Sequence, residues 1–158
     1  MRFCIHALQM LKYHDSLVSL KGLLGLLEMT GLNIERDYLL EVACIITEGN
    51  KKLSVVEELP SLVIHQPDEI VESMDSWCKL HHSKSGLIKA VQESTLTVEK
   101  AEDILIKFIQ KHTPAEKCPL AGNSVHLDKV FLTKFMPRVV NHLHYRIIDV
   151  SSLKELCR

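Results

Sequence analysis

Glu28 stands where its neighbours would allow it to hold a cation, and Asp128 is a second carboxylate, at the start of an expected helix. Glu28 follows an apolar run and precedes a turn at Gly31, and burying a charged carboxylate is costly unless a positive partner neutralises it. Hard divalent cations are such partners, because they bind carboxylate oxygens. Asp128 lies in the first turn of an expected helix, where the helix dipole favours its charged form. Each also has an ordinary interpretation, Glu28 as a solvent-facing strand end and Asp128 as a helix-start acid.

Several other residues could contact a ligand, although each suits an ordinary structural role as well. Trp77 is the only tryptophan, and a buried anchor in the core would suit it. His82 and its neighbour His81 would ordinarily be solvated histidines. Near the end of the chain, Tyr145 suits an aromatic residue of a strand, Arg146 a surface charge and Ser151 a helix cap.

Composition bounds the class of protein. The chain has 158 residues, enough for one domain with a sizeable core, and a net charge of −1. A balanced charge gives no general argument for nucleic-acid binding, so a basic surface would have to be local. The five cysteines are widely spaced and form no C-x-x-C pair, which argues against a zinc knuckle or a disulfide framework and favours a reducing compartment. His142 and His144 have strand spacing for metal ligands, but no third ligand lies near them.

The N-terminal segment has two open interpretations. Residues 1–21 are mildly basic and contain one acid, which fits either a mitochondrial targeting segment or an irregular N-terminus. Leucines at positions 17, 20, 24 and 27 have helical spacing and predict a short amphipathic helix. The same stretch is interrupted by Lys21 and is too short to span a bilayer, so no membrane segment is expected.

The rest of the chain alternates expected strands and helices. Residues 39–47 predict a buried strand, and residues 53–64 predict a second strand that forms a hairpin with it, with Pro60 at a bulge or an edge. One helix is expected from Asp68 through Met74 to Cys78, and another from Thr97 to the residues before Pro114. Then come, in order, a strand over 118–121, a turn, a helix over 125–136, a strand over 145–150 and a helix that a capping box begins at Ser152.

Five blocks of sequence resemble one family in order and in spacing. They are Leu27-Glu28-Met29-Thr30-Gly31-Leu32, Asp75-Ser76-Trp77-Cys78, Ser85-Gly86-Leu87, Ala121-Gly122-Asn123-Ser124-Val125-His126-Leu127-Asp128 and His144-Tyr145-Arg146-Ile147-Ile148-Asp149-Val150-Ser151. Together they resemble the oligoribonucleases, which are DEDDh-type 3′-to-5′ exoribonucleases of short RNA. The resemblance runs from about Leu27 to Arg158. It implies an α/β ribonuclease-H-like exonuclease fold, a mixed sheet flanked by helices, here expected without its C-terminal helix.

The resemblance also implies a catalytic set and shows where this sequence departs from it. The family hydrolyses the terminal phosphodiester with two metal ions, Mg²⁺ or Mn²⁺, held by four acids, and a histidine serves as the general base. Glu28 and Asp128 match two of the metal ligands. Leu26 stands where the family has its first aspartate, and the third motif, with its histidine and last aspartate, would lie beyond Arg158. The catalytic set is therefore expected to be incomplete.

The substrate residues that the resemblance implies are better preserved. Leu32 and Trp77 match a pair that stacks on a base, and stacking tolerates any base. His82 matches a contact to the 5′ phosphate. The remaining matches are Ser124 and three residues that cap the 5′ end of a partner's substrate across a homodimer interface: Tyr145, Arg146 and Ser151.

These observations lead to a set of expectations about the whole chain. Residues 1–26 form a divergent N-terminal segment, and residues 27–158 an incomplete exonuclease domain. The first functional hypothesis is a hydrolase that degrades short oligoribonucleotides, as an intracellular homodimer in mitochondria or in the cytoplasm and nucleus. The second is a non-catalytic relative that binds RNA ends or pairs with an intact subunit, and the third is a truncated product without a function of its own.

Overall fold

The computed structural model describes residues 21–49 and 52–158. Its first element is strand β1 (Gly22–Met29), so the helix expected over residues 17–27 is wrong from Gly22 onward, and its earlier part lies outside the described residues. The reason is tertiary: β1 pairs along its whole length with the following strand, and this pairing overrides the helical spacing of the leucines.

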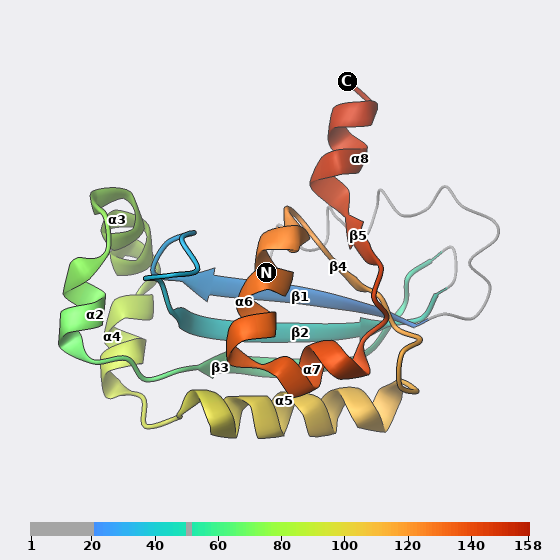
Figure 1. Ribbon diagram of the computed structural model, residues 1–158, viewed down its shortest axis with the longest axis horizontal. Helices are drawn as coiled ribbons and strands as arrows, with labels where there is room; N and C mark the ends of the chain where they lie inside the picture. Colours follow the sequence, from blue (N-terminus) through green and yellow to red (C-terminus); the bar gives the residue numbers. More distant parts are fainter. Residues whose placement is uncertain (1–20, 50–51) are drawn as a thin grey trace.

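A five-stranded mixed sheet forms the centre of the molecule, in the order β3-β2-β1-β4-β5 (Figure 1). Its other strands are β2 (Leu39–Thr47), β3 (Val55–Val63), β4 (Leu120–Gly122) and β5 (Ile147–Asp149). The pairs β1–β2 and β2–β3 are antiparallel, whereas β1–β4 and β4–β5 are parallel. The predicted hairpin is therefore confirmed. Pro60 lies on the edge strand, where the register shifts between the pairs Cys44–Leu59 and Val42–Leu62.

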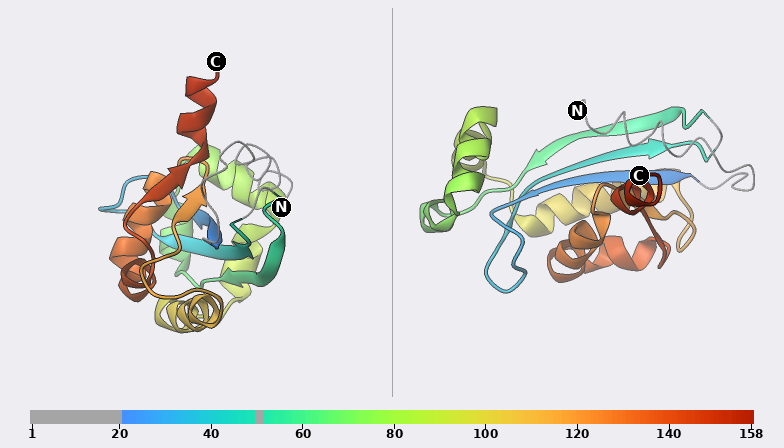
Figure 2. Two further views of the ribbon diagram at one scale, coloured as in Figure 1. Left: turned by 90° about the vertical axis from the view of Figure 1, so that its right-hand side faces the viewer. Right: turned by 90° about the horizontal axis from the view of Figure 1, so that it is seen from above.

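One face of the sheet is covered by three helices, α5 (Val98–His112), α6 (Val125–Phe135) and α7 (Pro137–His142), as the view from above in Figure 2 shows. Their apolar sides meet the sheet in the main core, where Ile109 and Phe131 are fully buried against Ile46 and Leu120. Thr97 caps α5 as predicted, because its hydroxyl oxygen accepts a hydrogen bond from the Lys100 backbone N–H at 3.4 Å.

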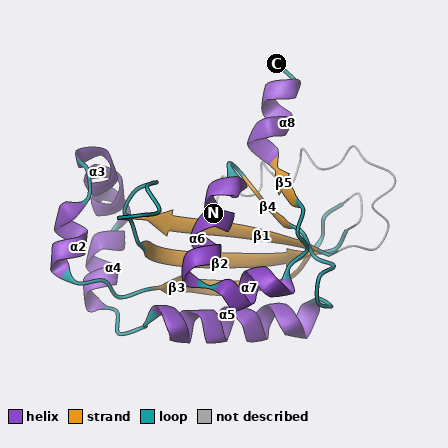
Figure 3. Ribbon diagram, in the orientation of Figure 1, coloured by secondary structure: helices purple, strands orange, loops and turns teal. Residues whose placement is uncertain are grey.

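Three shorter helices, α2 (Asp68–Ser73), α3 (Ser76–Ser85) and α4 (Leu87–Glu93), lie at the end of the sheet where β1 finishes (Figure 3). The single helix expected from Asp68 to Cys78 is wrong, because the chain breaks at Met74 and restarts. Asp75 caps the new helix, and its carboxylate accepts a hydrogen bond from the Cys78 backbone N–H at 2.8 Å. The break places Trp77 in the first turn of α3 instead of on the buried side of one long helix.

The last helix, α8 (Val150–Leu156), projects from the body of the molecule (Figure 1). It begins earlier than the capping box at Ser152 predicted, because Asp149 is the N-cap and accepts a hydrogen bond from the Ser151 backbone N–H at 2.9 Å. The strand expected over 145–150 is correspondingly short. Among residues 21–49 and 52–158, no helix combines the length and the apolar character needed to cross a membrane.

Candidate functional site

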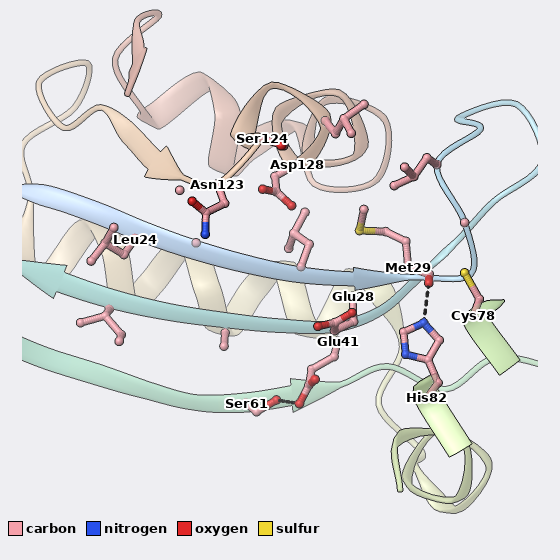
Figure 4. A pocket seen from close by; sticks show the side chains of 18 of the residues that line it. Leu24, Glu28, Met29, Glu41, Ser61, Cys78, His82, Asn123, Ser124 and Asp128 are labelled. Carbon is pink, nitrogen blue, oxygen red and sulfur yellow. Dashed lines mark hydrogen bonds between the residues drawn. The ribbon is translucent and has the colours of Figure 1, made fainter. Parts of the chain in front are cut away.

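A cavity of about 750 Å³ opens between the end of the sheet, α3 and the start of α6 (Figure 4). We call its carboxylates Glu28, Glu41 and Asp128 the acidic floor, and the pair Leu32 and Trp77 the mouth. The floor draws on β1, β2 and α6, and the mouth on the loop after β1 and on α3. Segments that are far apart in the sequence therefore meet at one cavity.

Glu28 and Glu41 stand directly opposite each other on the antiparallel strands β1 and β2. Burial raises the pKa of the Glu28 carboxyl above its ordinary value, His82 opposes this rise, and the charge of Glu41 adds to it. Ser61 on β3 donates a hydrogen bond to the Glu41 carboxylate. Like charges placed opposite each other in a strand pair are destabilising, so this pair would gain from a cation between its members.

Asp128 faces the same floor from the first turn of α6 (Figure 4). The pKa of its carboxyl is raised to about 7, first by burial and then by the charges of Glu28 and Asp149, while His126 acts in the opposite direction. The charge of Glu28 contributes to this rise, and both carboxylates line the same cavity. Their role as metal ligands stays a prediction. The raised pKa favours the protonated carboxyl at higher pH than in an ordinary aspartate.

The start of α6 is fixed by the C-terminal strand. Ser124, the N-cap of α6, has a left-handed backbone with φ of 50°. Its backbone N–H points at two acceptors, Asp149 Oδ1 and Ser151 Oγ, each at 3.0 Å, and its hydroxyl lies 3.3 Å from Ser151 Oγ. Ser124 lines the cavity, whereas Ser151 supports it from behind. These bonds set the direction of the helix that carries Asp128.

The two side chains of the mouth are highly exposed to solvent for apolar residues. Leu32 and Trp77 are each 64% exposed, so Trp77 is not the buried anchor that a lone tryptophan suggests. The Trp77 ring lies against His81, with ring centroids 4.0 Å apart and planes inclined by 35°. Exposed apolar side chains at the rim of a cavity are a common mark of a binding site.

His82 is buried beneath the mouth and not solvated. Its Nε2 lies 3.0 Å from the backbone carbonyl oxygen of Met29, a hydrogen bond that joins α3 to the end of β1 (Figure 4). His82 also lines the cavity, so Nδ1 is the ring nitrogen that is left for another contact. The contact with a 5′ phosphate stays a prediction.

Tyr145 and Arg146 are the predicted site residues that the structure keeps apart from the others. Tyr145 is 71% exposed, and both residues lie outside the cavity lining. They contact each other, since Arg146 Nε donates to the Tyr145 hydroxyl at 3.0 Å and the guanidinium carbon lies 5.4 Å from the ring centroid. Lys129 adds a hydrogen bond from its Nζ to the Tyr145 carbonyl oxygen at 2.6 Å.

Glu41 is the floor residue that the sequence reasoning missed. It is the only charged residue in the strand Leu39–Thr47, and this is the signal that could have revealed it. A carboxylate inside an otherwise apolar strand has to face either solvent or a site, and here it faces the cavity opposite Glu28.

The donor set limits what the floor could hold. No group of three or more His, Cys, Asp or Glu side chains within residues 21–49 and 52–158 is arranged to hold a metal ion. Two crowded carboxylates with raised pKa values, Glu28 and Asp128, nevertheless fit one hard divalent cation, because Mg²⁺ is usually bound through one or two carboxylates and keeps several waters. They do not by themselves supply the ligands of a two-metal centre.

Comparison with known proteins agrees with this geometry. Residues 27–158 match the model of the Exonuclease family. The chain is 58% identical over 132 residues to the proteins named "Oligoribonuclease, mitochondrial" from Bos taurus and Homo sapiens, a match that covers 84% of this chain and 55% of each relative. The oligoribonuclease of Chromobacterium violaceum is 48% identical over 132 residues, which cover 84% of this chain and 72% of that protein.

The chain thus spans about half the length of the mammalian relatives that it matches. The match includes every sequence block that led to the resemblance, and the mixed sheet with its flanking helices has the predicted ribonuclease-H-like architecture. On both grounds, the chain belongs to the exonuclease family and, within that family, to the oligoribonucleases.

Proposed function

We propose that this chain acts on short RNA as a 3′-to-5′ exoribonuclease, with the terminal nucleotides of the substrate held in the cavity. One observation carries the proposal: the paired carboxylates Glu28 and Asp128 and the exposed pair Leu32 and Trp77 line the same cavity. A base held at the mouth would bring its phosphate to the floor. Stacking and apolar contact do not depend on base identity, which suits an enzyme that removes any nucleotide.

The exonuclease family generally uses divalent metal ions, and we propose Mg²⁺ or Mn²⁺ for this chain. Glu28 and Asp128 would hold the ion, and Glu41 would add negative potential from the opposite strand. When bound, such an ion lowers the pKa of a coordinated water and stabilises negative charge on the phosphate and the leaving oxygen. The protein contributes the orientation: the loop and α3 fix the base, and the start of α6 fixes Asp128.

We also propose that the active form is a homodimer. Tyr145 and Arg146 are exposed and lie outside the cavity of their own subunit, so they are free to contact a second molecule. An arginine can hold a phosphate in a bidentate fork, and an arginine supplied by the partner would act as a cap that selects short substrates. Ser151 would take part less directly, because it already bonds to Ser124.

The division of the chain at Leu27 and its location in the cell are part of the same proposal. Residues 27–158 would form the exonuclease domain, and residues 1–26 a divergent segment, although β1 begins before the boundary at Gly22. The mammalian relatives are named as mitochondrial, which supports a mitochondrial location over a cytoplasmic or nuclear one. A general-base histidine is assigned to none of the described residues.

A second candidate function is RNA-end binding without hydrolysis, and one residue favours it. Leu26 stands two residues before Glu28 in β1, at the place of the family's first aspartate. A leucine cannot bind a cation, so the floor has one ligand fewer than the family pattern.

Hydrolysis of a labelled RNA dinucleotide decides between these functions. The chain is assayed with Mg²⁺, with Mn²⁺ and with EDTA, beside the variant Asp128→Ala. Metal-dependent release of mononucleotides that disappears in Asp128→Ala supports the exoribonuclease. Binding of a 5′-phosphorylated dinucleotide without release in either metal supports the second candidate, and absence of both binding and release refutes the two together.

A further inference from the structure

The loop between β1 and β2, residues 30–38, carries Leu32, and the Asp37 carboxylate accepts hydrogen bonds from two of its residues. Backbone hydrogen bonds from the Thr30 N–H to the Tyr38 carbonyl and from the Asp37 N–H to the Asn33 carbonyl also close the loop. Asp37 Oδ1 accepts a hydrogen bond from the Thr30 hydroxyl at 3.0 Å, and Oδ2 accepts one from the Asn33 backbone N–H at 2.8 Å. Thr30 Oγ1 in turn accepts from the Tyr38 backbone N–H at 3.0 Å. The carboxylate thus joins the beginning, the middle and the end of the loop.

Gly31 shows how closely this carboxylate packs against the loop. A Cβ atom at position 31 would lie 2.5 Å from Asp37 Oδ2 and 2.8 Å from Asp37 Cγ, which no real side chain tolerates. Only glycine leaves room for the carboxylate beside the backbone. Leu32 therefore lies between Gly31, which packs closely against the Asp37 carboxylate, and Asn33, which bonds to it.

Leu32 itself has little packing that could hold it. Its side chain is largely exposed, whereas Thr30 is buried with 2% exposure and the Asp37 side chain with 13%. The outer part of the loop is tied to α6, because Lys134 donates to the carbonyl oxygen of Ile34. The position of Leu32 is thus set by hydrogen bonds of its neighbours. Fixing a contact residue before the ligand arrives removes the entropic cost of ordering it on binding.

We propose that Asp37 is a positioning residue for RNA binding, which holds the 30–38 loop so that Leu32 is fixed opposite Trp77 before the substrate arrives. The inference rests on the proposed function, because it takes Leu32 as a contact to a base. Asp37 lies outside the cavity lining and acts through the loop. It bonds to Thr30, and the absence of a side chain at Gly31 leaves room for its carboxylate.

A double-mutant cycle on binding tests this role. The affinity for a 5′-phosphorylated RNA dinucleotide is measured by calorimetry in EDTA for the chain, Asp37→Asn, Leu32→Ala and the double variant. Asparagine keeps the shape of aspartate but has one accepting oxygen instead of two, so it can keep only one of the two hydrogen bonds. We expect Asp37→Asn and Leu32→Ala each to weaken binding about five-fold, the lower end of the range for a stacking contact. Glu35→Gln, the same change at an exposed position of the loop, is the matched control and should bind normally.

The double variant separates positioning from a general structural effect. If Asp37 acts through Leu32, Asp37→Asn adds no further loss once Leu32 is alanine, and the double variant binds like Leu32→Ala alone. Losses that multiply, or an Asp37→Asn variant that binds like the unchanged chain, overturn the proposal. Thr30→Val, which removes only the hydroxyl, repeats the test if Asp37→Asn fails to fold, with the same expected loss and the same overturning result.

A measurement without RNA separates this proposal from the proposed function. Amide hydrogen exchange should show Asn33 protected in the unchanged chain and in Glu35→Gln, and unprotected in Asp37→Ala, which has no side-chain acceptor, while Val42 in β2 stays protected in all three. An Asn33 amide that exchanges freely in the unchanged chain overturns the role of Asp37 whether or not RNA binds. Protection of Asn33 together with equal RNA affinity of Leu32→Ala and the unchanged chain instead refutes Leu32 as a base contact.

Discussion

The mouth and the floor of the cavity are built in opposite ways. At the mouth, the loop carrying Leu32 and the helix carrying Trp77 have their polar groups satisfied: Asp37 bonds within the loop, and Asp75 caps α3. At the floor, Glu28, Glu41 and Asp128 crowd together, and the pKa values of Glu28 and Asp128 are raised by burial and by neighbouring charge. The mouth is ready to bind as it stands, whereas the floor is short of positive charge.

This difference separates two properties that an enzyme usually shows together. Under the proposed function, binding of a base would depend on the mouth and would require no ion, because apolar contact and stacking would supply it. Hydrolysis would depend on the floor and on the cation that its carboxylates would hold. Variants of the two regions should therefore change different measurements, and the following predictions range from the largest expected effect to the smallest.

The largest effect is expected from completing the floor with Leu26→Asp. A carboxylate at this position would supply the ligand that the family pattern requires, and single members of a catalytic unit are worth orders of magnitude in rate. We expect Mn²⁺-dependent release of mononucleotides to rise by roughly 100-fold or more, while dinucleotide affinity in EDTA does not increase. Leu26→Asn, of equal size but without charge, is the control. An equal rise in Leu26→Asn, or none in either variant, would contradict the prediction.

The pH dependence of stability should reveal the crowding at the floor. The pKa of Asp128 is about 7 in the folded protein against 3.8 for an ordinary aspartate, so the folded state favours the protonated form. The resulting stabilisation is fully present below about pH 4, falls as pH rises and is lost above about pH 7; for this shift it is on the order of 4 kcal/mol. The pKa of Glu28 is also raised, so this residue makes stability fall with rising pH in the same direction.

Urea unfolding from pH 4 to pH 8 in EDTA measures this effect. The unfolding free energy should fall as pH rises, and in Asp128→Asn it should fall much less, since asparagine has no proton to lose. Addition of Mg²⁺ should raise the free energy of unfolding at pH 8 and change it little at pH 4. If the free energy of unfolding fell equally with pH in the unchanged chain and in Asp128→Asn, the acidic floor would not be the cause of the pH dependence.

At the mouth, Trp77→Ala should weaken dinucleotide binding in EDTA by roughly 5- to 150-fold, the range of about 1–3 kcal/mol per stacked base. Leu80→Ala offers a matched control, because Leu80 is 52% exposed on the same helix but lies outside the cavity lining. Calorimetry compares the two variants. Equal losses in both would mean that α3 as a whole, and not the Trp77 ring, determines affinity.

The smallest effect is expected from Arg146→Ala. Arg146 lies outside the cavity, so a monomer should lose less than about two-fold in dinucleotide affinity, as is usual for an exposed charge. A larger loss should appear only at protein concentrations where dimers form, if the partner supplies the cap. Titrations below and above the protein concentration at which half of the chains are dimeric, found by sedimentation, compare these cases. A large loss of dinucleotide affinity in the monomer would contradict the prediction that Arg146 acts only through a partner.

The sequence predicted the fold best where local signals and tertiary packing agree. The strand Leu39–Thr47 was predicted with its observed bounds, because its apolar residues are buried in the centre of the sheet. The sequence-based prediction of a helix failed for residues 22–27, because strand pairing overrode the helical spacing of the leucines. The prediction of one long helix failed at Met74, because the chain breaks there and Asp75 caps a new helix, although the apolar pattern continues. The predicted start of α8 was also wrong, because Asp149 replaced the expected cap.

The site was predictable as a set of residues but not as an arrangement. Glu28, Asp128, Leu32, Trp77, His82 and Ser124 line one cavity as their shared family pattern implied. Tyr145 and Arg146 lie outside this cavity, and the resemblance already assigned them to a partner's substrate. Glu41 could have been noticed as the only charge in its strand, but its place opposite Glu28 depends on cross-strand register. No sequence pattern pointed to Asp37, whose role depends on close packing against Gly31.

The parallel pairing of Leu23 with Leu120 has a consequence for the order in which the molecule folds. The 30–38 loop is closed by contacts between residues seven and eight positions apart, and such short closures take well under a millisecond. Asp128 reaches Glu28 only after β4 has joined β1 and Asp149 has bonded to Ser124, which are contacts of long sequence separation and therefore slow to form. During synthesis on the ribosome, the 30–38 loop can therefore be complete long before Glu28 and Asp128 meet.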